Sequence, residues 1–292
     1  MKKIFIVVTF VLCFTLMLNA ESLEDKLRYF NLEDATSFLQ PLANSMGAGM
    51  NSGLYNTAEV LKPFRPSFRF GGTFAIIPSS DKTFLAHSPY GEIVETATIF
   101  GTDVGKFTQG AEEILLPKGA DLSLVPVPQM MLALGLPFGN EVMFRGWFET
   151  KLSGEIGDMG FWGVGLKHSI DQYLPAIFPL DLSLVGFYQK MNVADFINLE
   201  SYSVNIAASI KVLMLTIYGG AGYEQANLEA KYVYSFPYSP DPPLVTTLDF
   251  KGKNDFSGML GARMTVFPLV SVFADFTYAH TSTINFGVGV GF

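Results

Sequence analysis

The stretch that decides the fold is residues 283–292, which read Thr-Ile-Asn-Phe-Gly-Val-Gly-Val-Gly-Phe. The even-numbered positions are large and apolar, whereas the odd-numbered positions are small or polar. Because side chains alternate between the two faces of a strand, one face is a continuous apolar stripe and the other is nearly bare. A strand of about ten residues with one apolar face is typical of a transmembrane β-barrel. The alternative is a buried strand of a soluble β-sandwich.

The composition of the whole chain also favours a barrel. Its 292 residues are 16% charged and 14% aromatic, with 28 glycines. After the first twenty residues no uninterrupted apolar run is long enough for a membrane helix, so the apolar residues are spread over short alternating segments. The formal net charge of −8, without a basic stripe, argues against nucleic acid as a partner.

Residues 1–20 have the pattern of a cleaved signal peptide. Two lysines precede an apolar core, and we expect the cut after Ala20, followed by export across the inner membrane to the outer membrane. The single cysteine, Cys13, lies inside the apolar core, and a lipoprotein cut before it is the less favoured alternative. The mature chain would then lack cysteine, which excludes disulfides and thiol chemistry.

Residues 21–60 differ from the rest of the chain because they carry helix signals. Capping patterns occur at residues 22–25 and 31–34, and apolar residues follow the second at helical spacing. We expect Pro41 to end or kink this helix. We expect the glycines that follow it to loosen the chain. The sequence therefore predicts an N-terminal helical plug segment, followed by a barrel over residues 61–292.

Alternating segments begin at Phe68, and short connections at residues 137–140, 211–213 and 267–269 indicate the periplasmic side. With an ambiguous segment at residues 90–100 included, about eleven strands can be counted, and the strand at Phe68 would then start at the outer side. Bacterial single-chain barrels have even strand numbers. We therefore expect an all-β antiparallel barrel of about 12 strands (range 10–14). Either a twelfth strand lies near residues 54–61, or residues 22–66 cross the lumen, or both hold.

Several short runs resemble an uncharacterised family of bacterial outer-membrane barrels, described as a domain of unknown function. That family is distantly similar to the outer-membrane fatty-acid and hydrocarbon transporters, which implies a plugged lumen. The final strand also resembles the terminal strands of bacterial barrels, which implies that Phe292 belongs to an assembly signal read by the insertion machinery. The runs are Asn-Ser-Gly-Leu-Tyr-Asn-Thr-Ala (51–58), Gly-Leu-Pro (135–137) with Arg145, Gly-Val-Gly-Leu-Lys-His (163–168), Gly-Ala-Arg (261–263) and Asp-Phe-Thr-Tyr (275–278).

Six charged side chains face the lumen if the alternation is extended along each strand. A charge on the lipid face would cost about 2–4 kcal/mol at the membrane midplane. The six form either a permeation path or ligand cradle, or a set of internal ion pairs in a filled barrel. They are Arg69, Arg145, Lys167, Asp181, Arg263 and Asp275.

Two more specific predictions concern the inner wall. A turn at residues 267–269 would place Arg263 diagonal to Asp275, within reach of an ion pair. The glycines at positions 287, 289 and 291 leave the wall bare, so we expect the plug to fill that space. The predicted plug residues against the bare wall are Phe38, Leu39 and Leu42.

The sequence contains little catalytic chemistry. The three histidines, His87, His168 and His280, are not at metal-ligand spacing, so no metal or cofactor is predicted. His280 with Ser282 raises the possibility of an outer-membrane hydrolase, but polar residues are expected at the tip of an outer hairpin in any case. We therefore expect a transporter or channel for a small, hydrophobic solute rather than an enzyme. The alternative is a non-conducting barrel with a structural or envelope-assembly role, and outer-membrane lipids are partners in both.

Overall fold

The computed structural model describes residues 26–27, 30–88, 91–109, 112–151, 158–175, 179–193, 197–234 and 244–291. The predicted signal peptide, the first helix-start signal at residues 22–25 and the terminal Phe292 lie outside these ranges. Among the described residues, no helix has the length and apolar character needed to span a membrane.

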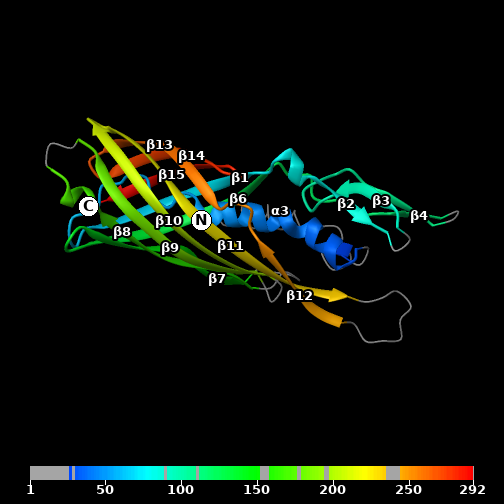
Figure 1. The fold of residues 1–292 in the computed structure, drawn as a ribbon. Helices are drawn as coiled ribbons and strands as arrows, with labels where there is room; N and C mark the ends of the chain where they lie inside the picture. Colours follow the sequence, from blue (N-terminus) through cyan, green and yellow to red (C-terminus); the bar gives the residue numbers. More distant parts are fainter. Residues whose placement is uncertain are drawn as a thin grey trace.

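The described residues form a closed antiparallel barrel of ten strands, which confirms the all-β class and falls within the predicted range of strand numbers (Figure 1). β1 pairs with both β6 and β15, and pairing between β10 and β11 closes the wall. The barrel strands are β1 (Pro66–Ile76), β6 (Leu124–Leu136), β7 (Asn140–Lys151), β8 (Asp158–Ser169), β9 (Asp181–Val193), β10 (Ile197–Val212), β11 (Leu215–Tyr234), β13 (Phe256–Phe267), β14 (Val270–Tyr278) and β15 (Thr283–Gly291).

The predicted count of about 12 was too high because residues 90–100 do not form a barrel strand. β3 (Ile93–Ala97) pairs only with β2 (Thr83–His87), and β4 (Lys106–Gln109) pairs with β5 (Glu112–Leu115). Strands of four or five residues are too short to cross a membrane, which needs about nine to eleven. We call residues 77–123 the outer module.

Because residues 90–100 do not add a barrel strand, the first strand runs in the direction opposite to the predicted one. β1 is antiparallel to β15, so it begins at the end of the barrel where β15 finishes. The prediction that the strand at Phe68 starts at the outer side is therefore wrong. Residues 54–61 are not a strand either; the second alternative, in which the chain crosses the lumen, is the one observed.

The two ends of the barrel differ. The turn end carries the short connections before β7, β11 and β14, whereas the loop end carries the outer module and the connection from β11 to β13. β11 has 20 residues and is about 65 Å long when extended. It leaves β13 after Tyr223 and pairs with β12 (Leu244–Lys251) over residues 227–234, and the ends of β11 and β12 extend past the rest of the barrel (Figure 1).

Each barrel strand places apolar side chains on the outer surface. The alternation seen in the sequence is the alternation of exposure in the structure, because successive side chains leave opposite faces of a strand. One exposed apolar residue from each strand, in chain order, illustrates the continuity of this band: Phe68, Leu132, Phe144, Trp162, Leu184, Ile206, Ile217, Leu260, Phe276 and Phe286.

Helix α3 (Leu32–Asn51) starts at the loop end and enters the lumen (Figure 1). The Asn31 side chain caps it by accepting a hydrogen bond from the Asp34 backbone N–H at 2.9 Å, as the capping pattern predicted. The helix does not end at Pro41 but continues for ten more residues, all buried. Residues 52–63 then cross the rest of the lumen to the turn end, where β1 begins.

The glycines of α3 bring the helix close to the barrel wall. A Cβ atom at Gly47 would lie 2.5 Å from the Cβ of Ala226, and one at Gly49 would lie 2.5 Å from a methyl group of Val127. Both distances are far below van der Waals contact. The expectation that these glycines loosen the chain is therefore wrong, since both are helical and buried against the wall.

Candidate functional site in the lumen

The half of the lumen toward the loop end is filled by apolar side chains around α3. Phe38 packs against Phe30 and Phe84, with ring centroids 5.3 and 6.5 Å away, and Leu39 and Leu42 belong to the same buried cluster. These residues were predicted to cover the bare glycine wall near the end of the chain. That prediction is wrong, because Gly287 is covered by the ring of Phe273.

The end of α3 is capped by side chains of the wall. Arg145 donates one hydrogen bond to the Met50 carbonyl at 2.5 Å and another to the Gln189 side chain at 3.0 Å. Gln189 donates to the same Met50 carbonyl at 2.8 Å. The last turn of α3 has no basic residue of its own, so Arg145 supplies the positive charge that a helix C-terminus favours. The geometry of Arg145 is therefore that of a helix cap.

A buried ion pair holds the segment that follows. Lys167 Nζ lies 2.9 Å from Glu141 Oε2, and each side chain is only 4% exposed. The same carboxylate accepts a hydrogen bond from the Leu61 N–H at 3.0 Å, and Lys167 donates to the Glu59 carbonyl at 2.9 Å. We call residues 52–63 the lumen segment. Both charges therefore bind backbone groups of the lumen segment as well as each other.

Asp181 acts on the same segment through a hydroxyl group. Its carboxylate accepts a hydrogen bond from Ser209 Oγ at 3.1 Å, and that oxygen accepts one from the Ala58 N–H at 3.0 Å. Asp181 is at the start of β9, at the turn end, and is only partly buried.

Asp275 does not pair with Arg263, so the predicted ion pair is wrong. The predicted register is correct, with Arg263 opposite Phe273. Asp275 instead accepts hydrogen bonds from Tyr218 Oη at 2.8 Å and Asn285 Nδ2 at 2.6 Å. Gly261 lies between Tyr218 and Asp275 in the sheet and has no side chain, so the tyrosine can reach across it.

Besides Arg145, whose buried Nε has no hydrogen-bond partner among the described residues, two further arginines are incompletely paired. Arg69 donates through Nη2 to the Leu54 carbonyl at 2.8 Å, while its buried Nη1 has no partner. Among the described residues, Arg263 has neither a hydrogen bond nor an ion pair from its guanidinium group, and it is half-buried.

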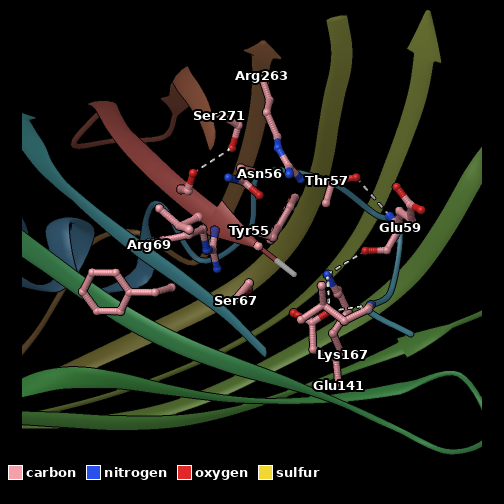
Figure 2. A pocket seen from close by; sticks show the side chains of 15 residues that line it. Tyr55, Asn56, Thr57, Glu59, Ser67, Arg69, Glu141, Lys167, Arg263 and Ser271 are labelled. Carbon is pink, nitrogen blue, oxygen red and sulfur yellow. Dashed lines mark hydrogen bonds and ion pairs between the residues drawn. The ribbon is translucent and has the colours of Figure 1, made fainter. Parts of the chain in front are cut away.

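Both arginines line a cavity of about 50 Å³ near the turn end (Figure 2). This volume has room for about four water molecules and is too small for a continuous solute path. The lining residues come from the lumen segment and from β1, β7, β8, β13, β14 and β15. The polar and charged ones are Tyr55, Asn56, Thr57, Glu59, Ser67, Arg69, Glu141, Lys167, Arg263 and Ser271.

The alternation of the sequence placed all six predicted charges on the inner side, but it did not single out their partners. Glu141, Gln189 and Tyr218 have inward parity on their strands, and parity could have identified them. Their hydrogen bonds to the lumen segment or across a glycine depend on three-dimensional packing, which the parity of one strand does not contain.

The three histidines are separate and bind different partners. His87 Nδ1 lies 3.0 Å from the Asp34 carboxylate, His168 bonds Asn140, and His280 lies 3.5 Å from Asp81. Ser282 Oγ, considered above with His280, donates to the Ala279 carbonyl instead. Within the described ranges no group of three or more His, Cys, Asp or Glu side chains could hold a metal ion.

Known structures with some similarity to this chain are barrels. The attachment invasion locus protein Ail of Yersinia pestis is 10% identical over 79% of this chain and 100% of its own, with a TM-score of 0.29. The translocator domain of the autotransporter NalP from Neisseria meningitidis is 11% identical over 91% and 99% of the two chains, with a TM-score of 0.27. The KdgM porin is 8% identical over 56% of this chain and 91% of its own, with a TM-score of 0.30.

TM-scores of this size mark loose superpositions, and the barrel described above follows from its own strand pairing. No curated protein matches the sequence. A protein-family model described as "Family of unknown function (DUF6588)" matches residues 1–292. The chain therefore belongs to this family of unknown function.

Proposed function

We propose that the protein is an outer-membrane β-barrel closed by its own N-terminal segment, and that it holds the outer module at the cell surface. The observation that carries this proposal is the filled lumen. Residues 32–63 occupy it from the loop end to the turn end, and the cavity that remains beside residues 55–61 is about 50 Å³. This favours the non-conducting alternative over an open channel.

The apolar outer band supports the membrane location. Every barrel strand contributes exposed apolar residues to it, and such a surface is stable in lipid but prone to aggregation in water. The tight turns before β7, β11 and β14 at one end, and the outer module and the extension formed by β11 and β12 at the other, support an orientation with the turn end in the periplasm. In this orientation the outer module and the start of α3 face the outside.

The orientation can be tested by labelling intact cells with a membrane-impermeant maleimide. The chain contains only Cys13, in the predicted signal peptide, so single cysteines can be introduced without further changes. Val104→Cys in the outer module should be labelled on intact cells. The matched control, Leu213→Cys in an exposed turn at the other end, should be labelled only after the outer membrane is permeabilised. The reverse pattern would refute the proposal.

A second candidate function, uptake of a small apolar solute, is favoured by an incomplete seam in the wall. The ladder between β6 and β7 covers only Met131–Leu136 and Asn140–Arg145, so the loop-end halves of these strands are not paired with each other. Pro126 and Pro128 lie in the unpaired part of β6 and cannot donate backbone hydrogen bonds. Gly146, with φ of 143°, lies where β7 leaves the ladder.

The seam could admit an apolar molecule sideways from the membrane without an open pore. Replacing both prolines (Pro126→Thr with Pro128→Thr) restores two donors and should let the ladder extend. If the seam admits solute, uptake of pyrene by cells that produce this variant should fall to the level of cells without the protein. Equal uptake by wild type, variant and empty cells would eliminate this candidate and leave the first unaffected.

A further inference from the structure

We propose that the cavity at the turn end of the lumen is a binding site for a phosphate group, held between Arg69 and Arg263. This site is separate from the role of holding the outer module, because it lies at the opposite end of the barrel. Figure 2 shows the two guanidinium groups among the side chains around this cavity, close to Tyr55 and Asn56 of the lumen segment.

The glycine wall provides the space between the two arginines. Arg69 on β1 lies opposite Gly289 on β15, and Gly289 lies opposite Ser271 on β14. The nearest atoms to a Cβ at Gly289 would be Ser271 Oγ at 3.0 Å and Arg69 Cγ at 3.5 Å. Any side chain at position 289 would therefore enter the cavity. The bare wall is not covered by the helix here but remains in part as open space.

The charges of the cavity do not balance. Three cations line it, against the two carboxylates of Glu59 and Glu141. Lys167 is fully engaged with Glu141 and the Glu59 carbonyl, while Glu59 itself is exposed. Among the described residues, Arg69 Nη1 and the whole Arg263 guanidinium group have no hydrogen-bond partner, and Arg263 is attracted to Glu59 and Glu141 only from beyond ion-pair distance. A shielded positive charge is costly unless an opposite charge or a hydrogen-bond acceptor reaches it.

An oxyanion satisfies these two groups better than a neutral ligand. Guanidinium groups present several N–H donors in a fixed plane and bind phosphate oxygens in pairs. The room for about four waters matches the four oxygens of one phosphate group. The hydroxyl groups of Ser67 and Ser271 and the Asn56 amide line the same space and can donate further hydrogen bonds.

The test is calorimetric titration of the purified, folded barrel in detergent with inorganic phosphate. We expect saturable binding to the wild type and a loss of affinity of about tenfold or more for Arg263→Ala, which removes one charged donor group. Arg263 holds no other residue, so this variant should fold. Arg65→Ala is the matched control, since Arg65 is exposed at the same end of the barrel and does not line the cavity.

A second variant tests whether phosphate binding needs the open space of the cavity as well as the two arginines. Gly289→Val leaves both arginines in place but fills the cavity, and it should also weaken phosphate binding. Phosphorus analysis of the organic extract distinguishes a lipid headgroup in the site from free phosphate. The proposal is overturned if the wild type shows no saturable binding, or if Arg263→Ala binds phosphate as well as Arg65→Ala does.

Discussion

The two halves of the lumen are filled in different ways, and the difference explains where the charged residues lie. Toward the loop end the lumen contains α3, whose backbone hydrogen bonds are satisfied within the helix. The surrounding wall can therefore be apolar, with residues such as Val125, Val127 and Leu199 buried in one cluster with the helix. Toward the turn end the lumen contains an extended segment, whose backbone groups are not paired with one another as they are in a helix.

A buried backbone group without a partner is costly, so the wall must supply partners for the extended segment. Several inward polar side chains do this. Arg69 donates to the Leu54 carbonyl, Lys167 to the Glu59 carbonyl, and Glu141 accepts from the Leu61 N–H. The charges predicted from the sequence as a possible ligand path are thus, for the most part, partners of the lumen segment.

The largest effect is expected from breaking the ion pair in the polar half. Lys167→Met leaves the buried Glu141 carboxylate without its cation and should lower the free energy of unfolding by about 3–5 kcal/mol. Urea titration of the purified barrel in detergent measures this change.

The matched control is an exposed pair of the same type. In the outer module Lys106 lies 2.6 Å from Glu113, and both side chains are more than half exposed. Lys106→Met should therefore change the free energy of unfolding by at most about 1 kcal/mol. If the two lysine variants are equally stable, the pair in the lumen does not hold the segment as described.

A smaller effect is expected from disturbing the apolar half. Gly49→Val introduces a side chain where a Cβ already lies 2.5 Å from Val127, so the helix must shift away from the wall. Overpacking of this kind costs about 1–3 kcal/mol. Gly258→Val is the control, because a Cβ at Gly258 meets no atom within 4 Å. The same urea titration applies, and a Gly49→Val variant as stable as Gly258→Val would mean that α3 is not in close contact with β6.

The cap of α3 should contribute less. Asn31→Ala removes the side-chain oxygen that accepts the Asp34 N–H and should lower stability by about 1 kcal/mol. Asn31→Ser keeps an acceptor oxygen without placing a second negative charge beside Asp34, and it should be closer to the wild type. Thermal unfolding of the three proteins side by side would detect the difference, and equal midpoints for Asn31→Ala and Asn31→Ser would argue against the cap.

The smallest effect concerns pH at the outer module. The hydrogen bond from His87 to the Asp34 carboxylate raises the pKa of His87 above its ordinary value, with additional attraction from Asp34 and Glu33. A raised pKa in the folded state adds stability below the ordinary pKa of about 6.5, and this is lost as pH rises through the folded value.

Hydrogen exchange of the first turn of α3, corrected for its intrinsic pH dependence, should therefore show more protection at pH 5 than at pH 9. His87→Gln should remove the difference. If the protection of His87→Gln differs between pH 5 and pH 9 as much as that of the wild type, the pH dependence comes from titratable groups other than His87.

The sequence predicted the faces of the strands better than their registers. Alternation has a period of two residues, so a shift of two residues leaves every side chain on the same face. From the sequence alone we predict Tyr278 opposite Ile284 and Ala133 opposite Arg145. The structure pairs Phe276 with Ile284 and Met131 with Arg145, each shifted by two.

The lumen segment could be predicted only in part. The cap at Asn31 is local, so the sequence indicated it correctly. The continuation of α3 beyond Pro41 and the close contacts of Gly47 and Gly49 depend on the enclosing wall, which supports a helix that local propensity alone would end. The site at Arg69 and Arg263 depends on four strands meeting across a glycine wall, which the pattern of any single strand does not contain.

The most direct test of the central claim, that the N-terminal segment closes the barrel, is conductance in planar lipid bilayers. The full-length protein should show no steady conductance. Deletion of residues 21–63, which removes both α3 and the extended segment from the lumen, should produce stable open channels, and these would show that inserted barrels are detected. Steady conductance of the full-length protein equal to that of the deletion variant would contradict the account.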